Sequence, residues 1–456
     1  MFTSRVVRSL LGFVAPAVIS LVAAPRARGQ QPDPMGPLVA EAFRANLGLE
    51  ADRLADREGA ADVSAARGRF MPSLELDARS SRLSGVPNIG TFVNPAFQAL
   101  NGVLGSNRFP TNLDFTLPQA NDSHLELRQP LFNAGLVAGY EAARARSDGR
   151  HDALLASSRR LAAEVQTAYL DEASARRAVE IYAAALALAE ENERVAERLV
   201  AAGRATPEAV FRARADRSDV EQRLAEARQG QAAAARVFNQ MLRRPLDARV
   251  EVIPDSALDL PLTIGADSAV ANALAHREEL RGADAGIRSA EAGTRAATAA
   301  YLPSLSLAVD YGYQGRDPGF HPGQDYWMAS LVVSWNLFDG GSDAARREAA
   351  NLAVRQARVR RQDLDEQIEV EVRSAYDAAT VARAAIATAQ DRLDAARATY
   401  QLVRRRYEEG VASPVELVDA RTELTAAELN RSVTAYQYAI RYVDLERAAA
   451  LRDLGR

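Results

Sequence analysis

Two long stretches of the chain carry apolar and charged residues with the period of an α-helix and lack the residues that end helices. Neither Gly nor Pro occurs in residues 150–202 or in residues 342–409. Within the first stretch, Ile181, Leu188 and Val195 recur at heptad spacing, which is typical of helices that pack along a seam. The pattern therefore predicts unusually long helices with packing partners along their length.

The boundaries follow from where Gly and Pro return. We expect long helices over about 133–202 and 339–409, and shorter helices over about 38–69, 207–242, 266–300 and 414–453. A helix over 133–202 would be about 105 Å long at 1.5 Å per residue. Because no compact domain of this size covers such a length, the shorter helices must stack end to end beside the long ones.

Four other segments alternate with period two, as strands do. They predict strands over about 73–83, 122–132, 304–314 and 326–338. This pattern suits a transmembrane β-barrel as well as a half-buried soluble sheet. The only two Trp residues, Trp327 and Trp335, share one face of the last strand about 26 Å apart, comparable with a lipid-facing band about 25 Å tall. We therefore favour membrane strands with both Trp side chains as interface anchors.

The order of elements occurs twice. Phe70-Met71-Pro72-Ser73 returns as Tyr301-Leu302-Pro303-Ser304, and both long helices end at a Gly followed by a Pro. Residues 30–265, with an equatorial segment at 243–265, and residues 266–456 each predict helix, strand pair, very long helix, turn and helix. Polar stretches at 84–121 and 315–325 predict loops between the strands.

Four strands cannot close a barrel by themselves. Because open sheet edges are not viable in lipid, a membrane sheet of this size requires further copies of the chain. The topology therefore predicts oligomerisation.

The N-terminus resembles a removable signal peptide. Arg5 and Arg8 precede an apolar run over 10–24, and small residues follow near position 29, as signal peptidase requires. We expect residues 1–29 to be cleaved and the protein to be exported.

Composition excludes several kinds of chemistry. The chain has no Cys, so it has no disulfide, no thiol nucleophile and no cysteine for an N-terminal lipid. Its four His residues, His124, His151, His276 and His321, are scattered without metal-ligand spacing. The net charge of −4 disfavours nucleic-acid binding. We predict no catalytic site, no metal and no cofactor.

These motifs together resemble the outer-membrane efflux protein family, the TolC-like exit ducts. The resemblance rests on the duplication, on the strand ends Gln129-Pro130-Leu131-Phe132-Asn133-Ala134-Gly135 and Ser334-Trp335-Asn336-Leu337-Phe338-Asp339-Gly340-Gly341, and on Arg406-Tyr407-Glu408-Glu409-Gly410-Val411-Ala412-Ser413-Pro414-Val415-Glu416-Leu417-Val418-Asp419-Ala420.

The resemblance implies a mostly α fold with β-strands. It implies a homotrimer, with a twelve-strand barrel in the lipid of the outer membrane that continues into a twelve-helix tunnel through the periplasm. Such a protein is the passive channel of a tripartite efflux pump or a type I secretion system, joined by a periplasmic adaptor protein to an inner-membrane pump.

The resemblance also assigns the two helix-to-helix turns to the periplasmic tip. Adaptor docking would involve Gly203, Thr206, Pro207, Gly410, Ser413, Pro414 and Leu417. Helix chemistry accounts for much of this pattern on its own, because Gly ends helices, Ser and Thr cap them and Pro suits their first position.

A gate at the tip is implied by four residues. Glu416 and Asp419 match an acidic ring, while Tyr407 and Glu208 match a tyrosine and acidic partner that brace the closed state. Their i, i+3 spacing places Glu416 and Asp419 on one helical face, although first-turn acids are also favourable in any helix. Ala412 departs from the family pattern, which has an arginine there.

Two other functions remain open at this point. A periplasmic adaptor or coiled-coil interaction protein would also carry long helices, but it would have one helical hairpin flanked by soluble β-domains. An exported hydrolase would require a catalytic constellation. The sequence does not identify a substrate.

Overall fold

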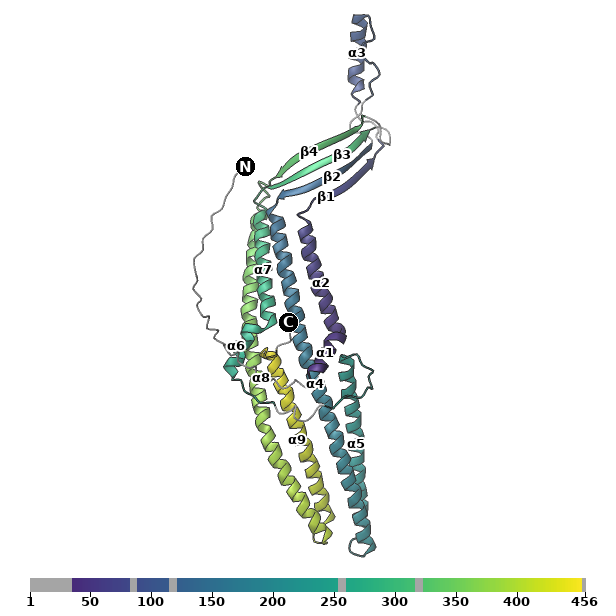
Figure 1. Ribbon diagram of the computed structural model, residues 1–456, viewed down its shortest axis with the longest axis vertical. Coiled ribbons are helices and arrows are strands. Elements are labelled where there is room, and N and C mark those ends of the chain that lie inside the picture. The colour runs from purple at the N-terminus through teal and green to yellow at the C-terminus, as the bar shows by residue number, and fades with distance from the viewer. Residues whose placement is uncertain (1–34, 83–87, 115–120, 253–259, 316–322, 453–456) are drawn as a thin grey trace, which may run out of the picture.

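The computed structural model describes residues 35–82, 88–114, 121–252, 260–315 and 323–452. The predicted signal peptide, residues 1–29, lies outside these residues. Figure 1 shows an elongated molecule in which a tilted sheet separates a long helical shaft from one small helix. The elements, in chain order, are α1 (Gly36–Ala45), α2 (Leu47–Gly68), β1 (Ser73–Ser80), α3 (Gly90–Leu104), β2 (Asn121–Phe132), α4 (Ala134–Ala201), α5 (Pro207–Met241), α6 (Ala266–His276), α7 (Glu278–Ala299), β3 (Ser304–Gly315), β4 (Asp325–Ser334), α8 (Ser342–Glu408) and α9 (Pro414–Ala448).

The mostly α fold with a small sheet agrees with the fold class that the sequence predicts. The order α1-α2-β1-β2-α4-α5 in the first half matches α6-α7-β3-β4-α8-α9 in the second. None of the described helices is both long enough and apolar enough to cross a membrane.

Two helices expected to be continuous are each broken at one residue. The helix over 38–69 is interrupted at Asn46, whose backbone is extended at φ −68° and ψ 126° and whose side chain accepts a hydrogen bond from the Leu49 amide at 3.0 Å. The helix over 266–300 is interrupted at Arg277, which has similar dihedral angles, φ −65° and ψ 129°. One extended residue therefore ends the first helix and begins the next in both repeats.

The loop expected over 84–121 is partly helical, because it contains the 15-residue helix α3. The Gly, Pro and Asn residues of this stretch made it resemble a loop, and the helix is held in place by asparagine side chains and not by a buried core. The last strand is also shorter than expected and ends at Ser334. Gly340 and Gly341 both have positive φ, 55° and 82°, so α8 begins only after them.

The four strands form one antiparallel sheet in the order β1-β2-β3-β4. Its register aligns apolar residues across all four strands, in the rows Leu76–Leu125–Tyr311–Trp327 and Leu74–Leu127–Val309–Ala329. The intervening row, Glu75–Glu126–Asp310–Met328, is mainly acidic and lies on the opposite face. One face of the sheet is therefore apolar from edge to edge.

In the helical shaft, α4 and α8 run past the shorter helices. Near the sheet the neighbouring pairs are α2 with α4, α4 with α7, and α7 with α8; farther away they are α5 with α4, α4 with α9, and α9 with α8 (Figure 1). The helices α1 and α6 lie where the two levels meet. The largest buried cluster is at this junction, around Phe238, Tyr169, Leu170 and Val165.

Helices α4 and α7 are joined by ion pairs that repeat along their length. Arg281, Arg288 and Arg295 of α7 pair with Asp152, Asp148 and Glu141 of α4 at 3.0, 3.3 and 2.7 Å. The two helices approach closely at Gly149, where an added Cβ would lie 3.6 Å from that of Ala285. Small residues therefore set the helix separation, and arginines line its margins.

Replacing Phe238 with Ala tests the junction. Phe238 is fully buried and stacks edge-on against Tyr169 at 5.8 Å between ring centroids. We expect Phe238→Ala to destabilise the helical shaft by about 3–5 kcal/mol, measured as a lower midpoint of thermal unfolding. Val252→Ala, at a side chain that is 65% exposed between α5 and α6, is the control and should leave that midpoint nearly unchanged. Equal effects would contradict this description of the core.

Candidate functional site

The two helix-to-helix turns, the tips of the α4–α5 and α8–α9 hairpins, have the same backbone geometry. Gly203 and Gly410 adopt φ of 70° and 77°. The amide of Gly203 bonds the Val200 carbonyl at 2.9 Å and that of Arg204 bonds the Leu199 carbonyl at 2.8 Å. The equivalent bonds at Gly410 and Val411 are 2.9 and 2.8 Å. Both turns are Schellman motifs, which require a left-handed residue and so favour Gly.

The second helix of each hairpin begins in a different way. Pro207 and Pro414 occupy the first positions, as fixed φ favours. The Ser413 hydroxyl accepts a hydrogen bond from the Glu416 amide at 3.2 Å, whereas the Thr206 side chain makes no capping bond. Only the second tip is therefore fixed by its cap.

The tips of the two hairpins lie next to each other at the end of the shaft (Figure 1). A Cβ added to Gly410 would be 3.4 Å from Nη2 of Arg204, so the guanidinium of the first turn lies against the backbone of the second. The sequence motifs from both repeats therefore form one composite surface.

Leu417, expected on the docking surface, lies in the core instead. It is 3% exposed and packs with Tyr407 and Ala412 in a buried cluster of α8 and α9. Leu188, Val195 and Leu199 of α4 cover this cluster, and a hollow of about 460 Å³ remains between α4 and α8. The heptad residues of α4 thus face the second hairpin. Burial raises the pKa of the Tyr407 hydroxyl.

The acidic residues of the expected gate lie on the surface of the tips. Glu416 and Asp419 are exposed on α9, and the Glu416 carboxylate lies 3.4 Å from the Ser413 hydroxyl. Glu208 lies on α5 and pairs with Arg212 at 3.5 Å. In the described part of the chain no hydrogen bond joins Glu208 to Tyr407, so the structure does not bring that pair together within one chain.

A buried ion pair that sequence reasoning missed joins the two hairpins. Arg421 of α9 pairs with Asp216 of α5, and their side chains are 3% and 9% exposed. Oδ2 of Asp216 and Nε of Arg421 are buried without a hydrogen-bond partner. Burial raises the pKa of Asp216, and the charge of Arg421 offsets only part of that rise. No local pattern marks this pair, because its members belong to different repeats.

The two Trp residues lie at the free edge of the sheet. Trp327 is in β4 and 75% exposed, in the apolar row opposite Tyr311. Trp335 lies just beyond β4, is 57% exposed, and its indole N–H donates to the Tyr301 carbonyl at 3.1 Å. Both side chains are therefore exposed on the surface of the single chain.

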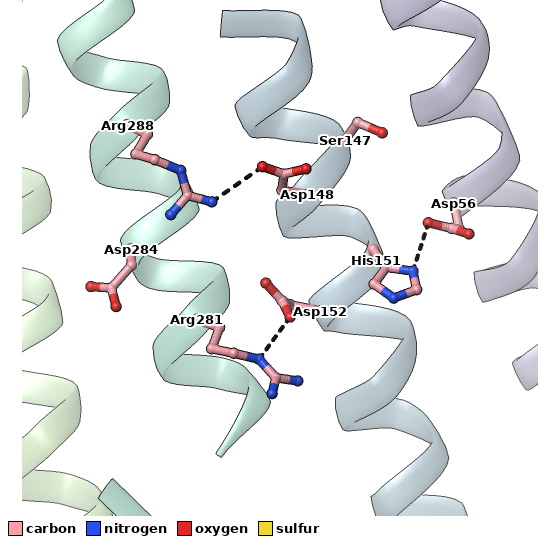
Figure 2. A pocket seen from close by; sticks show the side chains of 8 residues that line it. All are labelled: Asp56, Ser147, Asp148, His151, Asp152, Arg281, Asp284 and Arg288. Carbon is pink, nitrogen blue, oxygen red and sulfur yellow. Dashed lines mark hydrogen bonds and ion pairs between the residues drawn. The ribbon is translucent and has the colours of Figure 1, made fainter. Parts of the chain in front are cut away.

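A polar hollow of about 530 Å³ lies between α2, α4 and α7 (Figure 2). His151 faces Asp56 at 3.4 Å, and Asp148 and Asp152 face Arg288 and Arg281. Its charged groups thus mostly pair with each other. Among the described residues, no group of His, Asp and Glu is arranged to hold a metal ion. This hollow belongs to the interhelical ion pairs of the shaft.

Known proteins match both the sequence and the fold. A family model described as outer membrane efflux protein matches residues 38–242 and 269–451. Protein CyaE of Bordetella pertussis is 30% identical over 158 residues, 34% of this chain and 33% of that protein. The toluene efflux pump outer membrane protein TtgF of Pseudomonas putida is 28% identical over 180 residues, 38% of this chain and 36% of that protein. These alignments therefore span about a third of each relative.

Solved structures match nearly the whole chain. CusC superposes with a TM-score of 0.74 at 19% identity, over 91% of this chain and 92% of that one. The CmeC outer membrane channel of Campylobacter jejuni gives a TM-score of 0.74 at 18% identity, over 91% and 85% of the two chains. The fold is that of outer-membrane channel proteins.

The two caps offer a matched test of the tip. Ser413→Ala removes the bond to the Glu416 amide and should weaken the first turn of α9 by about 1 kcal/mol, seen as faster hydrogen exchange of that amide. Thr206→Ala should change exchange at the start of α5 much less, because Thr206 makes no capping bond. A larger effect at Thr206 would contradict the described geometry.

Proposed function

The chain belongs to the outer membrane efflux protein family, and from this membership we propose that it is the outer-membrane channel of an efflux pump or a type I secretion system. The observation that carries the proposal is the sheet. Its apolar rows continue from β1 to β4 and stay exposed at both edges, with Leu74 and Leu76 both 68% exposed and Trp327 75% exposed. Exposed apolar surface of this extent indicates a membrane or another protein.

A trimer supplies what the single sheet lacks. The strands β1 and β4 each have one neighbour, so the outer edge of each presents unpaired backbone groups. In lipid those groups must be satisfied. Pairing β4 of one chain with β1 of the next satisfies both edges, and three such chains close a twelve-strand barrel in the outer membrane.

The helical levels are open in the same way. Helices α2 and α8 are the outer members near the sheet, and α5 and α8 are the outer members below it. Their surfaces carry apolar side chains that the single chain does not cover: Leu54 of α2 is 55% exposed, Phe211 of α5 is 67% exposed and Val359 of α8 is 65% exposed. Ring closure buries these surfaces and forms a periplasmic tunnel of twelve helices.

The tips form the periplasmic entrance and its gate in this proposal. Three copies of Glu416 and Asp419 bring six carboxylates to one axis, which favours cations and opposes closure by repulsion. Tyr407 supports the closed tip from inside the chain, because its ring belongs to the buried cluster of α8 and α9 and lines the hollow between α8 and α4. Glu208 contributes negative charge on α5 and has no bracing contact with Tyr407 inside one chain.

The Asp216–Arg421 pair opposes opening. It joins α5 to α9 about 10–14 Å from the starts of those helices at 1.5 Å per residue. Moving the two helices apart breaks this ion pair while its side chains are still buried. Each side chain is then a buried charge without a partner, which is energetically unfavourable. Ala412 is 8% exposed and belongs to the apolar cluster, so it cannot form an ion pair. We assign the ionic link between the hairpins to Arg421 instead.

The composite tip surface receives a periplasmic adaptor, which joins the channel to an inner-membrane pump. The residues available for docking are Gly203, Thr206, Gly410 and Ser413, all of which are exposed, together with the two prolines. An adaptor hairpin that spreads the α8–α9 hairpin from the α4–α5 hairpin would act directly on the Asp216–Arg421 pair.

The channel proposal is tested in cells and in planar bilayers. The mature chain should fractionate with the outer membrane, purify as a trimer and conduct ions weakly when closed. Glu416→Gln with Asp419→Asn should lower the conductance and reduce cation preference, because the repulsion that opposes closure and the charge that attracts cations are both lost. Asp219→Asn, an exposed carboxylate on α5 paired with Arg223, is the control. Recovery of the chain in the inner membrane or free periplasm would overturn the proposal.

The ion pair between hairpins has its own test. Arg421→Ala leaves Asp216 buried without a counter-charge, which costs about 3–5 kcal/mol, and should give trimers with severalfold higher conductance. Arg392→Ala, which breaks the exposed Arg392–Glu423 pair within one hairpin at 2.8 Å, should cost less than about 1 kcal/mol and leave conductance unchanged. The double exchange Asp216→Arg with Arg421→Asp should restore closure. Wild-type conductance in Arg421→Ala trimers would refute the assignment.

A further inference from the structure

Helix α3 presents an apolar stripe that its own chain leaves uncovered. Phe92, Ala96, Ala99 and Val103 fall at i, i+4, i+7 and i+11, which places them on one face. Phe92 is 78% exposed and Val103 is 87% exposed. In the described part of the chain α3 makes no extensive contact with another helix or strand. The stripe is thus the outer surface of the helix in a single chain.

The opposite face of α3 is fixed, so the stripe cannot turn inward. The Asn94 amide donates to the Leu113 carbonyl and its oxygen accepts from the Leu113 amide, both at 2.8 Å. Asn101 makes the same pair of bonds with Phe109, at 2.7 and 3.0 Å. The rings of Phe97 and Phe109 lie 5.3 Å apart. Helix α3 and the returning segment 106–114 therefore form one small unit.

The topology places this unit at the end of the sheet away from the shaft. It lies between β1 and β2, on the side where Ser80 pairs with Asn121, and Figure 1 shows it beyond the strand ends. In the proposed trimer, on which this inference rests, three identical units stand at the outer end of one barrel. Such tethering gives them a high effective concentration for each other.

The charge pattern indicates what covers the stripe. Residues 88–107 contain no Asp, Glu, Lys or Arg. Helices that lie on membranes carry Lys or Arg on the polar face and often Trp near it, and α3 has neither. Identical uncharged stripes, in contrast, meet without like-charge repulsion, and their 4-3-4 spacing is that of helices packed on helices. We propose that the stripe of α3 packs against α3 of a neighbouring copy and joins the outer ends of the chains.

Disulfide cross-linking tests the contact directly, because the chain has no cysteine of its own. Val103→Cys and the smaller change Ala96→Cys lie on the stripe, and Gln98→Cys lies on another face of the same helix and is also exposed. Disulfides require Cα atoms within about 7 Å of each other. Mild oxidation of the intact trimer should give a covalent dimer with both stripe variants, removed by reducing agent, and at least tenfold less with Gln98→Cys.

The outcomes separate this inference from the proposed function. Purified trimers in which neither stripe variant cross-links, or in which Gln98→Cys cross-links equally well, overturn the α3 contact and leave the channel proposal intact. A chain that is not trimeric by mass measurement overturns both. A dimer from Val103→Cys alone or from Ala96→Cys alone, without one from Gln98→Cys, supports the contact and locates its centre along the helix.

Discussion

Backbone hydrogen bonding at the two edges of the sheet is the constraint on which the rest of the structure depends. The strands β1 and β4 have unpaired outer edges, and the apolar rows that cross the sheet suit it to lipid, where unpaired amides and carbonyls cost several kcal/mol each. A sheet that is apolar on one face and open at both edges is not a stable unit alone. In the proposed channel the chain is therefore one sector of a larger ring, and its outer helices also present surfaces that a neighbouring copy would cover.

The helical shaft combines two long helices with pairs of shorter helices. Because α4 and α8 are continuous helices that span both levels of the shaft, they connect the sheet to the tips without a break. The shorter helices end and begin at the junction of the two levels. Asn46 and Arg277 interrupt the helices there, and the cluster around Phe238 lies at the same junction. Small residues at Gly149 and Ala285 permit close packing near the sheet. Two repeats of one plan thus give four helices at every level.

Much of this architecture follows from sequence because it is local. Period-two segments, uninterrupted helical stretches and the Gly and Pro residues of the tips each specify one element, and the duplication orders them. Helix α3 was missed because two asparagines bonded to Phe109 and Leu113 replace an apolar core. The burial of Leu417 and the pairing of Asp216 with Arg421 were missed for another reason. Both depend on which helices pack together, and those helices lie about 200 residues apart in the chain. Because the sequence contains many Arg and Asp residues, it offers many possible ion pairs and does not indicate which one forms.

The tip combines two electrostatic effects that differ in strength because they differ in burial. Glu416 and Asp419 are exposed, so water and salt screen their repulsion over a Debye length of about 8 Å. Asp216 and Arg421 are removed from solvent, where a charge left alone is costly. In the proposed channel the buried ion pair within each chain therefore stabilises the closed state. The exposed carboxylates of neighbouring chains favour opening, and salt weakens their effect. Force from a docked partner has to reach the buried pair before the repulsion between tips can complete the opening.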